Sequence, residues 1–488
     1  MHENKYPSLY QINTRVWLTE LSENLGRPAT LDDIPDQELD RLQSMGFDFI
    51  WFLSVWTIGE RGRKISLENT EWRQELEHTL PDLKDEDIGG SGFAIASYHV
   101  SAKLGGDAAL KRLRDKLNKR GLKLMLDFVP NHMGPDHHWV QEHPEYFISG
   151  TEEDLKNNPK NYTKVKIQQH ERILAYGRDP YFSGWPDTFQ IDYSNPAAAE
   201  AMKQELIRIA DQCDGVRCDM AMLILPEVFE RTWGRKAQSF WPLAIEAVRE
   251  KNPDFCFMAE VYWDMEWTLQ QQGFDYTYDK RLYDRLREGH ARSIREHFHA
   301  ESDYQNKMAR FLENHDEARA AHTFGSGRSQ AAAILTFLST GLRFFHQGQF
   351  EGRMKRISPH LIRGPHEPVN THLQAFFTLL LSVIKQPLFK NAHRKVLECV
   401  PAWDGNGSWD SFIAFAWEGN GKRALVAVNY SPHTGQCYVR VPFSEIANQS
   451  IEFRDLMSTS IYKRDGNELL SRGLYLDLPP WGFHVFEF

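Results

Sequence analysis

Four short segments carry the polar side chains that glycosidic-bond chemistry requires. They are DFVPNH (127–132), DGVRCD (214–219), FMAEV (257–261) and ENHD (313–316). Each begins as an apolar, strand-like run and reaches a carboxylate, Arg or His at or beside its end. Enzymes that cleave glycosidic bonds use a pair of carboxylates in two different roles. The segments therefore predict an enzyme whose polar centre is assembled from the ends of several strands.

The spacing within these segments suggests roles for three carboxylates. Arg217 and Asp219 lie two residues apart in one predicted strand, so both side chains project to the same side. A guanidinium this close favours the ionised carboxylate that a nucleophile requires. Glu260 follows after 260 − 219 = 41 residues, which is ample for one helical crossover. Asp316, preceded by His315, is placed to hold sugar hydroxyls and to stabilise positive charge in the transition state.

Each of these residues, considered alone, also has a purely structural explanation. A strand-end Asp or Glu in an α/β protein is usually a helix cap or a member of a surface ion pair. Four such strand ends in succession, with His, Arg or a second carboxylate nearby, are much harder to attribute to capping. The pattern as a whole favours a catalytic centre.

Strand-like and helix-like runs alternate for roughly three quarters of the length. Asp107–Arg120 repeats leucine at helical spacing, and Asn195–Gln212 opens with Asn-Pro in cap and first-turn positions. Alternating β and α units predict a parallel sheet, and eight of them predict closure into a (β/α)8 TIM barrel. The strand candidates are Leu9–Leu18, Phe47–Val55, Leu122–Val129, Gly215–Met220, Phe255–Val261, Phe274–Tyr278, Ala309–Asn314 and Leu342–Gln347.

Two regions break this alternation and predict further domains. Residues 133–190, after the third strand, have little periodicity and many aromatic residues, so we expect a small inserted domain that forms one wall of a cleft. From residue 396 to 488 short strands and Gly-rich turns predict an antiparallel β-sandwich. The barrel itself is then expected to comprise residues 1–132 and 191–395.

Composition restricts the partners and the compartment. A net charge of −10 argues against nucleic acid or an anionic membrane as a partner. No apolar stretch is long enough for a membrane span, and no signal-peptide pattern is present. The five cysteines include no CxxC pair. These features predict a cytoplasmic protein without disulfides or structural zinc.

The four segments resemble, in order, the four signature motifs of the α-amylase family, glycoside hydrolase family 13. WPDTFQIDYSNP (185–196) resembles the additional signature at the end of that family's inserted domain, and SGFAIASY (91–98) resembles the segment before its second barrel helix. The resemblance covers essentially the whole chain. It implies a retaining glycosidase with an inserted domain and a C-terminal sandwich, acting on α-glucans or oligosaccharides.

The resemblance also implies a role for each site residue. Asp219 would be the nucleophile, Glu260 the general acid/base and Asp316 the transition-state stabiliser. The substrate-binding residues that it implies are His132, Arg217, His315, Phe93 and Arg319. Arg319 reads equally well as a surface arginine at the start of a helix.

Calcium is the one metal that the resemblance suggests, and no cofactor is required for the chemistry. Asn131 occupies a calcium-linked position of the family, although a turn residue before His132 is an equally good interpretation. Many relatives carry Lys-His three and four residues after the nucleophile, where this chain has Met222 and Leu223. We therefore expect weaker dependence on calcium and an altered contact to the leaving group.

Three functional hypotheses follow. The first is hydrolysis of α-glucosidic bonds, and the second is transglycosylation or isomerisation through the same glycosyl-enzyme, as in glucanotransferases or trehalose-forming enzymes. The third is a non-catalytic carbohydrate-binding relative, which the retention of all three carboxylates disfavours.

Overall fold

A closed barrel of eight parallel strands forms the centre of the protein. The computed structural model describes residues 4–419 and 421–488. Neighbouring strands around the barrel run in the order β1-β14-β13-β12-β11-β10-β5-β2. All eight predicted strands are present, which confirms the TIM barrel. Their bounds are β1 Ser8–Asn13, β2 Phe49–Leu53, β5 Lys123–Phe128, β10 Gly215–Cys218, β11 Cys256–Ala259, β12 Tyr276–Tyr278, β13 Met308–Arg310 and β14 Leu342–His346.

One strand prediction was too long. Residues 14–18 belong to helix α1 (Thr14–Leu25), because the side chain of Asn13 caps the helix by accepting from the amide of Val16. The two predicted helices are confirmed as α5 (Gly106–Asn118) and α8 (Pro196–Ala210). Other helices on the outside of the barrel are α2 (Asp36–Met45), α10 (Trp241–Lys251), α12 (Lys280–Glu288), α16 (Ser326–Phe337) and α17 (Thr371–Ile384).

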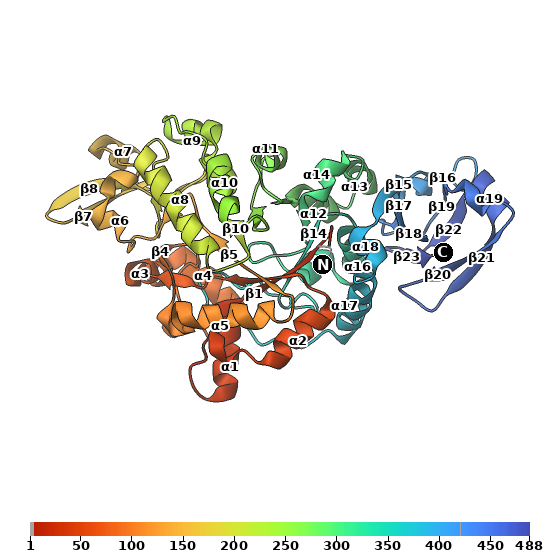
Figure 1. The fold of residues 1–488 in the computed structure, drawn as a ribbon, viewed down its shortest axis with the longest axis horizontal. Helices are drawn as coiled ribbons and strands as arrows, with labels where there is room; N and C mark the ends of the chain where they lie inside the picture. Colours follow the sequence, from red (N-terminus) through yellow and green to blue (C-terminus); the bar gives the residue numbers. More distant parts are fainter. Residues whose placement is uncertain (1–3, 420) are drawn as a thin grey trace.

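The segment between β5 and α8 protrudes from the barrel. It contains a two-stranded hairpin, β7 (Tyr162–Ile167) and β8 (His170–Ala175), and returns through β9 (Phe189–Gln190), which pairs with β6 (His132–Met133). Figure 1 shows the hairpin at the opposite end of the molecule from the C-terminal strands. The pairing of β6 with β9 holds the two ends of the segment together at the barrel edge.

A second excursion from the barrel was not assigned from the sequence. Between β2 and α5 the chain forms β3 (Trp56–Ile58), α3 (Glu60–Glu68), α4 (Thr70–Thr79) and β4 (Ile95–Val100). Strands β3 and β4 pair in antiparallel fashion. This excursion carries Phe93, and it also carries Trp72 on α4.

The C-terminal strands form one antiparallel sheet of six strands and one of three. The first strand, β15, begins at His393. Alternate residues of β17 (Phe412–Gly419) enter two separate apolar clusters. Ala414 packs between the two sheets, and Phe415 packs against the core of the barrel. Because alternate side chains of a strand point to opposite faces, β17 packs within the sandwich on one face and against the core of the barrel on the other. No helix in the described part of the chain is long and apolar enough to cross a membrane.

Candidate active site

The ends of β10 and β11 place Asp219 beside Glu260. Cys218 and Ala259, the last residues of the two strands, are partners in the parallel register. The amide of Glu260 donates to the carbonyl of Cys218 at 3.0 Å, so the pairing continues one residue past the strands. Both carboxylates therefore stand at the C-terminal edge of the barrel, where TIM-barrel enzymes bind substrate.

Arg217 holds the carboxylates in position. Its side chain is fully buried, and Nη1 donates to Oδ1 of Asp219 at 2.6 Å. Nη2 lies 2.7 Å from Oε2 of Glu260 and 3.9 Å from Oδ2 of Asp316. A buried guanidinium is tolerated only when it is paired, and here adjacent nitrogens of one planar group face two carboxylates. Arg217 thereby sets the spacing of the pair.

Glu260 is buried and accepts hydrogen bonds at both carboxyl oxygens. Its Oε2 accepts from the amide of Met220 at 2.8 Å, and Oε1 accepts from the hydroxyl of Tyr262 at 2.9 Å. Met220 has a left-handed backbone, with φ of 40°, which is unusual for a side chain of this kind. Burial raises the pKa of Glu260 to about 8, and the negative charges nearby add to the effect against the opposing charge of Arg217. The group is therefore protonated at neutral pH, as a general acid must be.

Asp316 stands nearer the solvent, with a side chain 38% exposed. Nε2 of His315 lies 3.0 Å from its Oδ2. The amide nitrogen of Gln11 is 2.8 Å from Nδ1 of His315, and because an amide nitrogen only donates, Nδ1 accepts and Nε2 carries the proton. The ring of Phe93 stacks on His315 at a centroid distance of 5.3 Å. Beside Asp316, Phe93 therefore provides an apolar ring and His315 provides a polar one.

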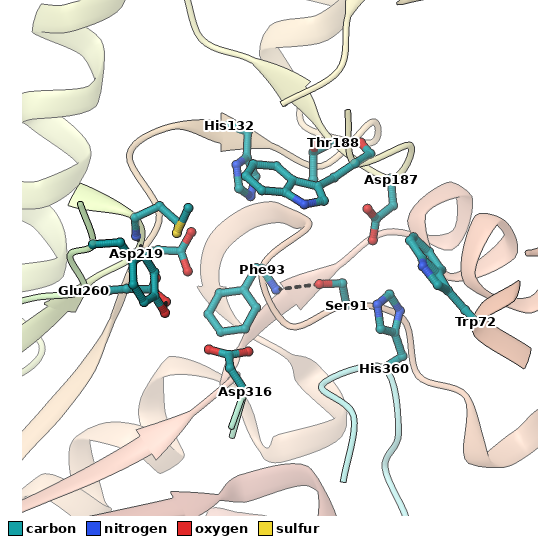
Figure 2. A pocket seen from close by; sticks show the side chains of 13 residues that line it. Trp72, Ser91, Phe93, His132, Asp187, Thr188, Asp219, Glu260, Asp316 and His360 are labelled. Atoms are coloured by element: carbon teal, nitrogen blue, oxygen red, sulfur yellow. Dashed lines mark hydrogen bonds between the residues drawn. The ribbon is translucent and has the colours of Figure 1, made fainter. Parts of the chain in front are cut away.

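A cavity of about 300 Å³ lies between these groups. Five residues predicted from the sequence line it, as Figure 2 shows: Asp219, Glu260, Asp316, His132 and Phe93. Arg217 and His315 contact these residues directly. His132 approaches the ring of Trp185 at 5.2 Å between centroids. The geometry therefore brings seven of the predicted residues to one place.

Arg319 does not line this cavity. It is buried, and its Nη1 donates to Glu313 at 2.6 Å and to the carbonyl of Gln347 at 2.8 Å. Its Nε donates to the carbonyl of Lys355 at 3.2 Å. These contacts connect the loop after β13 to the loop after β14. Arg319 therefore holds two loops of the site together without lining the cavity.

Other lining residues were not predicted as site residues. They are Trp72, Ser91, Trp185, Asp187, Thr188, Met220, Tyr262 and His360. Trp72 lies within an amphipathic helix and His360 within a loop that has no periodicity, so neither carries a signal in the sequence. Asp187 falls inside the additional signature, and its place in the motif was the only available indication.

The residues around Asn131 do not fit a calcium ion. Nε2 of Gln190 donates to the side-chain oxygen of Asn131 at 3.0 Å, to the carbonyl of Asn131 at 2.9 Å and to the carbonyl of Ile191 at 3.1 Å. A donor nitrogen thus occupies the point where three oxygens converge, and calcium needs six to eight oxygen ligands. Among the described residues, no group of three or more His, Cys, Asp or Glu side chains is arranged to hold a metal.

We therefore expect a chelator to leave thermal stability unchanged. Calcium bound tightly to the native state alone would raise the melting temperature by several degrees, because ligand binding adds directly to the free energy of unfolding. The measurement is thermal denaturation with excess EDTA, with added calcium, and after dialysis without either. A large drop with EDTA that calcium reverses would show a tight site that these contacts do not account for.

Comparisons with known proteins agree with this geometry. The family model of the alpha-amylase catalytic domain matches residues 29–360, more than half of the 488 residues. An alpha-1,4-glucan:maltose-1-phosphate maltosyltransferase of Burkholderia pseudomallei is 27% identical over 284 residues, which are 56% of this chain and 21% of that protein. An alpha-amylase of Haloarcula japonica is 22% identical over 431 residues, 86% of this chain and 55% of that protein. The chain thus spans about a fifth and about half of the length of these two curated relatives.

Solved structures show the same fold over the whole chain. A maltogenic alpha-amylase from Thermotoga neapolitana superposes with a TM-score of 0.71 and 19% identity, covering 100% of this chain and 99% of that one. An alpha-amylase from Lactobacillus plantarum gives a TM-score of 0.68 and 19% identity, covering 99% of each. At this identity the structures support the fold alone, and the family model carries the assignment. The chain belongs to the α-amylase family.

Proposed function

We propose that the protein is a retaining glycoside hydrolase that acts on α-glucosidic bonds of α-glucans or malto-oligosaccharides. The observation that carries the proposal is the contact of one buried guanidinium, Arg217, with both Asp219 and Glu260. Retaining glycosidases need two carboxyl groups only ~5–5.5 Å apart, and inverting enzymes need ~6.5–9.5 Å between them. Because Asp219 and Glu260 both contact the guanidinium of Arg217, their carboxyl groups are held close together, which favours the shorter separation of a retaining enzyme.

The chemistry then assigns each group a step. Asp219 attacks the anomeric carbon while Glu260 gives its proton to the leaving oxygen, so one C–O bond forms as the other breaks. Water then attacks the glycosyl-enzyme, loses a proton to Glu260 and releases Asp219. Asp316 and the protonated Nε2 of His315 are placed to bind ring hydroxyls and to balance the positive charge that develops on the sugar.

Transglycosylation is the second candidate, and a specific surface favours it. Tyr181 and Trp263 are exposed, with rings 5.0 Å apart at right-angled packing, and Trp263 follows Tyr262 of the cavity wall. The guanidinium of Arg231 already lies over both rings, and their remaining exposed surface suits contact with an acceptor sugar. The maltosyltransferases among the relatives are consistent with such a reaction.

The proposal includes the compartment and the partners. Four cysteines, Cys213, Cys218, Cys399 and Cys437, are buried thiols outside any disulfide, which supports a reducing compartment such as the cytoplasm. The substrate is a carbohydrate, and the net charge of −10 supports the absence of a nucleic-acid partner.

The stereochemistry of the first product tests the mechanism. Two successive displacements at the anomeric carbon give net retention, so an α-glucoside should release the α-anomer first. Proton NMR follows the anomeric signals before mutarotation, with a panel of α-linked di- and oligosaccharides as substrates. Maltose added as acceptor would give longer products if transfer competes with hydrolysis. Initial β-product would refute the nucleophile assignment, and no cleavage of any α-glucoside would refute the proposed activity.

A further inference from the structure

Asp187 is a buried carboxylate that has no use in the mechanism above. Its side chain is 3% exposed, and Oδ2 has no hydrogen-bond partner in the described part of the chain. The residue lines the cavity, and Figure 2 shows its carboxylate directed into the space between Trp72 and Ser91. Burial raises the pKa of Asp187 to about 7. An unpaired buried carboxylate costs folding free energy, so a ligand is the natural partner for this oxygen.

His360 adds a second hydrogen-bond acceptor at the same end of the cavity. The hydroxyl of Ser66 donates to the carbonyl of Gly62 at 3.2 Å, and its oxygen lies 2.9 Å from Nδ1 of His360. In the tautomer in which the hydroxyl gives its proton to Gly62, Nδ1 carries the hydrogen and Nε2 is left as an acceptor. Burial lowers the pKa of His360 to about 3, so the ring is neutral.

An aromatic face completes this end of the cavity. The indole of Trp72 lies 4.4 Å from the ring of His360 between centroids, and both residues line the cavity. The end therefore offers a carboxylate and an imidazole nitrogen as acceptors next to an apolar face. Hydroxyl groups on a ring with apolar faces, as in a sugar, match this combination.

The position of Glu260 decides which part of the substrate this end receives. Figure 2 shows Asp187, Trp72 and His360 on one side of the cavity and Glu260 on the other. Glu260 protonates the leaving oxygen, so the leaving group lies on its side and the glycone extends toward Asp187. The cavity has a volume of about 300 Å³, within the ~300–1,000 Å³ typical of ligand pockets, and Trp72 and His360 stand at the end of it that the glycone reaches.

We propose that Asp187, together with His360 and Trp72, binds the terminal hydroxyl groups of the glycone and makes this enzyme exo-acting. It then removes short units from the non-reducing end of an α-glucan and does not cut within the chain. This inference rests on the proposed glycosidase function. Asp187 is a specificity-determining residue in this role and takes no part in bond cleavage.

The test compares two substrates that differ only at the non-reducing end. One is p-nitrophenyl α-maltopentaoside, and the other is the same compound with its non-reducing end capped by an ethylidene acetal. We expect the wild-type protein to cleave the free-ended compound and to be at least ~100-fold slower on the capped one, since the cap removes hydroxyls that a charged acceptor binds. Similar rates on both would overturn the exo assignment while leaving the glycosidase function intact, and no cleavage of either would overturn both.

Variants at Asp187 test the residue itself. We expect Asp187→Ala and Asp187→Asn to lose about 10- to 100-fold in kcat/KM on the free-ended compound, because hydrogen bonds to a charged group are lost. Their melting temperatures should equal or exceed that of the wild type, since the variants remove a buried carboxyl group whose Oδ2 has no partner among the described residues. Glu153→Gln, an exposed site in the same inserted segment, is the control and should change neither value. Unchanged kcat/KM, or a fall in melting temperature that parallels the loss of activity, would overturn the role of Asp187.

Discussion

Asp219→Asn is expected to reduce kcat by about 10⁴-fold or more on every substrate, because removing a catalytic nucleophile costs several factors of ten at ~1.4 kcal/mol each. The amide has nearly the shape of the carboxylate but cannot attack the anomeric carbon. Nη2 of Arg217 still lies beside Glu260, and the amide oxygen of the variant can accept from Nη1, so the buried guanidinium keeps its hydrogen-bond partners. Circular dichroism and thermal unfolding should therefore show a folded protein. Retention of even a tenth of the wild-type activity would refute the assignment.

A second variant separates loss of the nucleophile from loss of the fold. Asp219→Gly opens space next to the anomeric carbon, and added azide can then act in place of the carboxylate. An α-glucoside should give the β-glycosyl azide, because only one displacement takes place. Glu153→Gln treated with azide is the control and should give none of this product. Absence of the azide adduct in folded Asp219→Gly would point to a different nucleophile.

The barrel could be predicted from the sequence because its strands are buried on both faces. Runs such as 255–259 are apolar throughout, and turn signals or carboxylates limit them. The ends of the strands were less certain. The sequence predicts one strand over Leu9–Leu18, whereas the hydrogen bond that Oδ1 of Asn13 accepts from the amide of Val16 marks where the helix begins.

Two of the catalytic residues were predictable for the same reason, since Asp219 follows directly after β10 and Glu260 directly after β11, whereas Asp316 lies six residues beyond the end of β13. Register fixes Asp219 and Glu260 as neighbours without any loop contribution. Residues on the excursion between β2 and α5 have no such constraint. Trp72 reaches the cavity because α4 packs at the barrel edge, and His360 reaches it from a loop about 290 residues further along the chain. The contact between the two rings therefore depends on tertiary packing.

The contact that argues against calcium at Asn131 also carries no signal in the sequence. The sequence is compatible with Asn131 as a calcium ligand or as a turn residue. It does not predict Gln190 as a site residue. The pairing of β6 with β9 brings the two together, because His132 and Gln190 are register partners. The amide nitrogen then satisfies oxygens that a cation would otherwise bind.

Glu260→Gln is expected to affect substrates according to their leaving groups. A general acid contributes about 10²–10⁴-fold where the leaving oxygen is a poor one, as in a natural sugar, and little for an activated aryl glycoside. Cleavage of malto-oligosaccharides should fall by that factor, and the glycosylation step on p-nitrophenyl substrates should be largely retained. Pre-steady-state release of p-nitrophenol measures that step before hydrolysis of the glycosyl-enzyme. Equal losses on both substrates would contradict the acid role.

The pH profile provides an independent test of the same residue. Burial raises the pKa of Glu260 to about 8, so the protonated acid predominates below that pH and is lost as the pH rises through it. In the wild type, kcat/KM on malto-oligosaccharides should therefore decline above about pH 8. Glutamine has no proton to lose there, so Glu260→Gln should show no decline in that range, provided that thermal unfolding confirms a folded protein throughout. A decline that persists unchanged in the variant would assign the alkaline limb to another group and remove the argument that Glu260 is the proton donor.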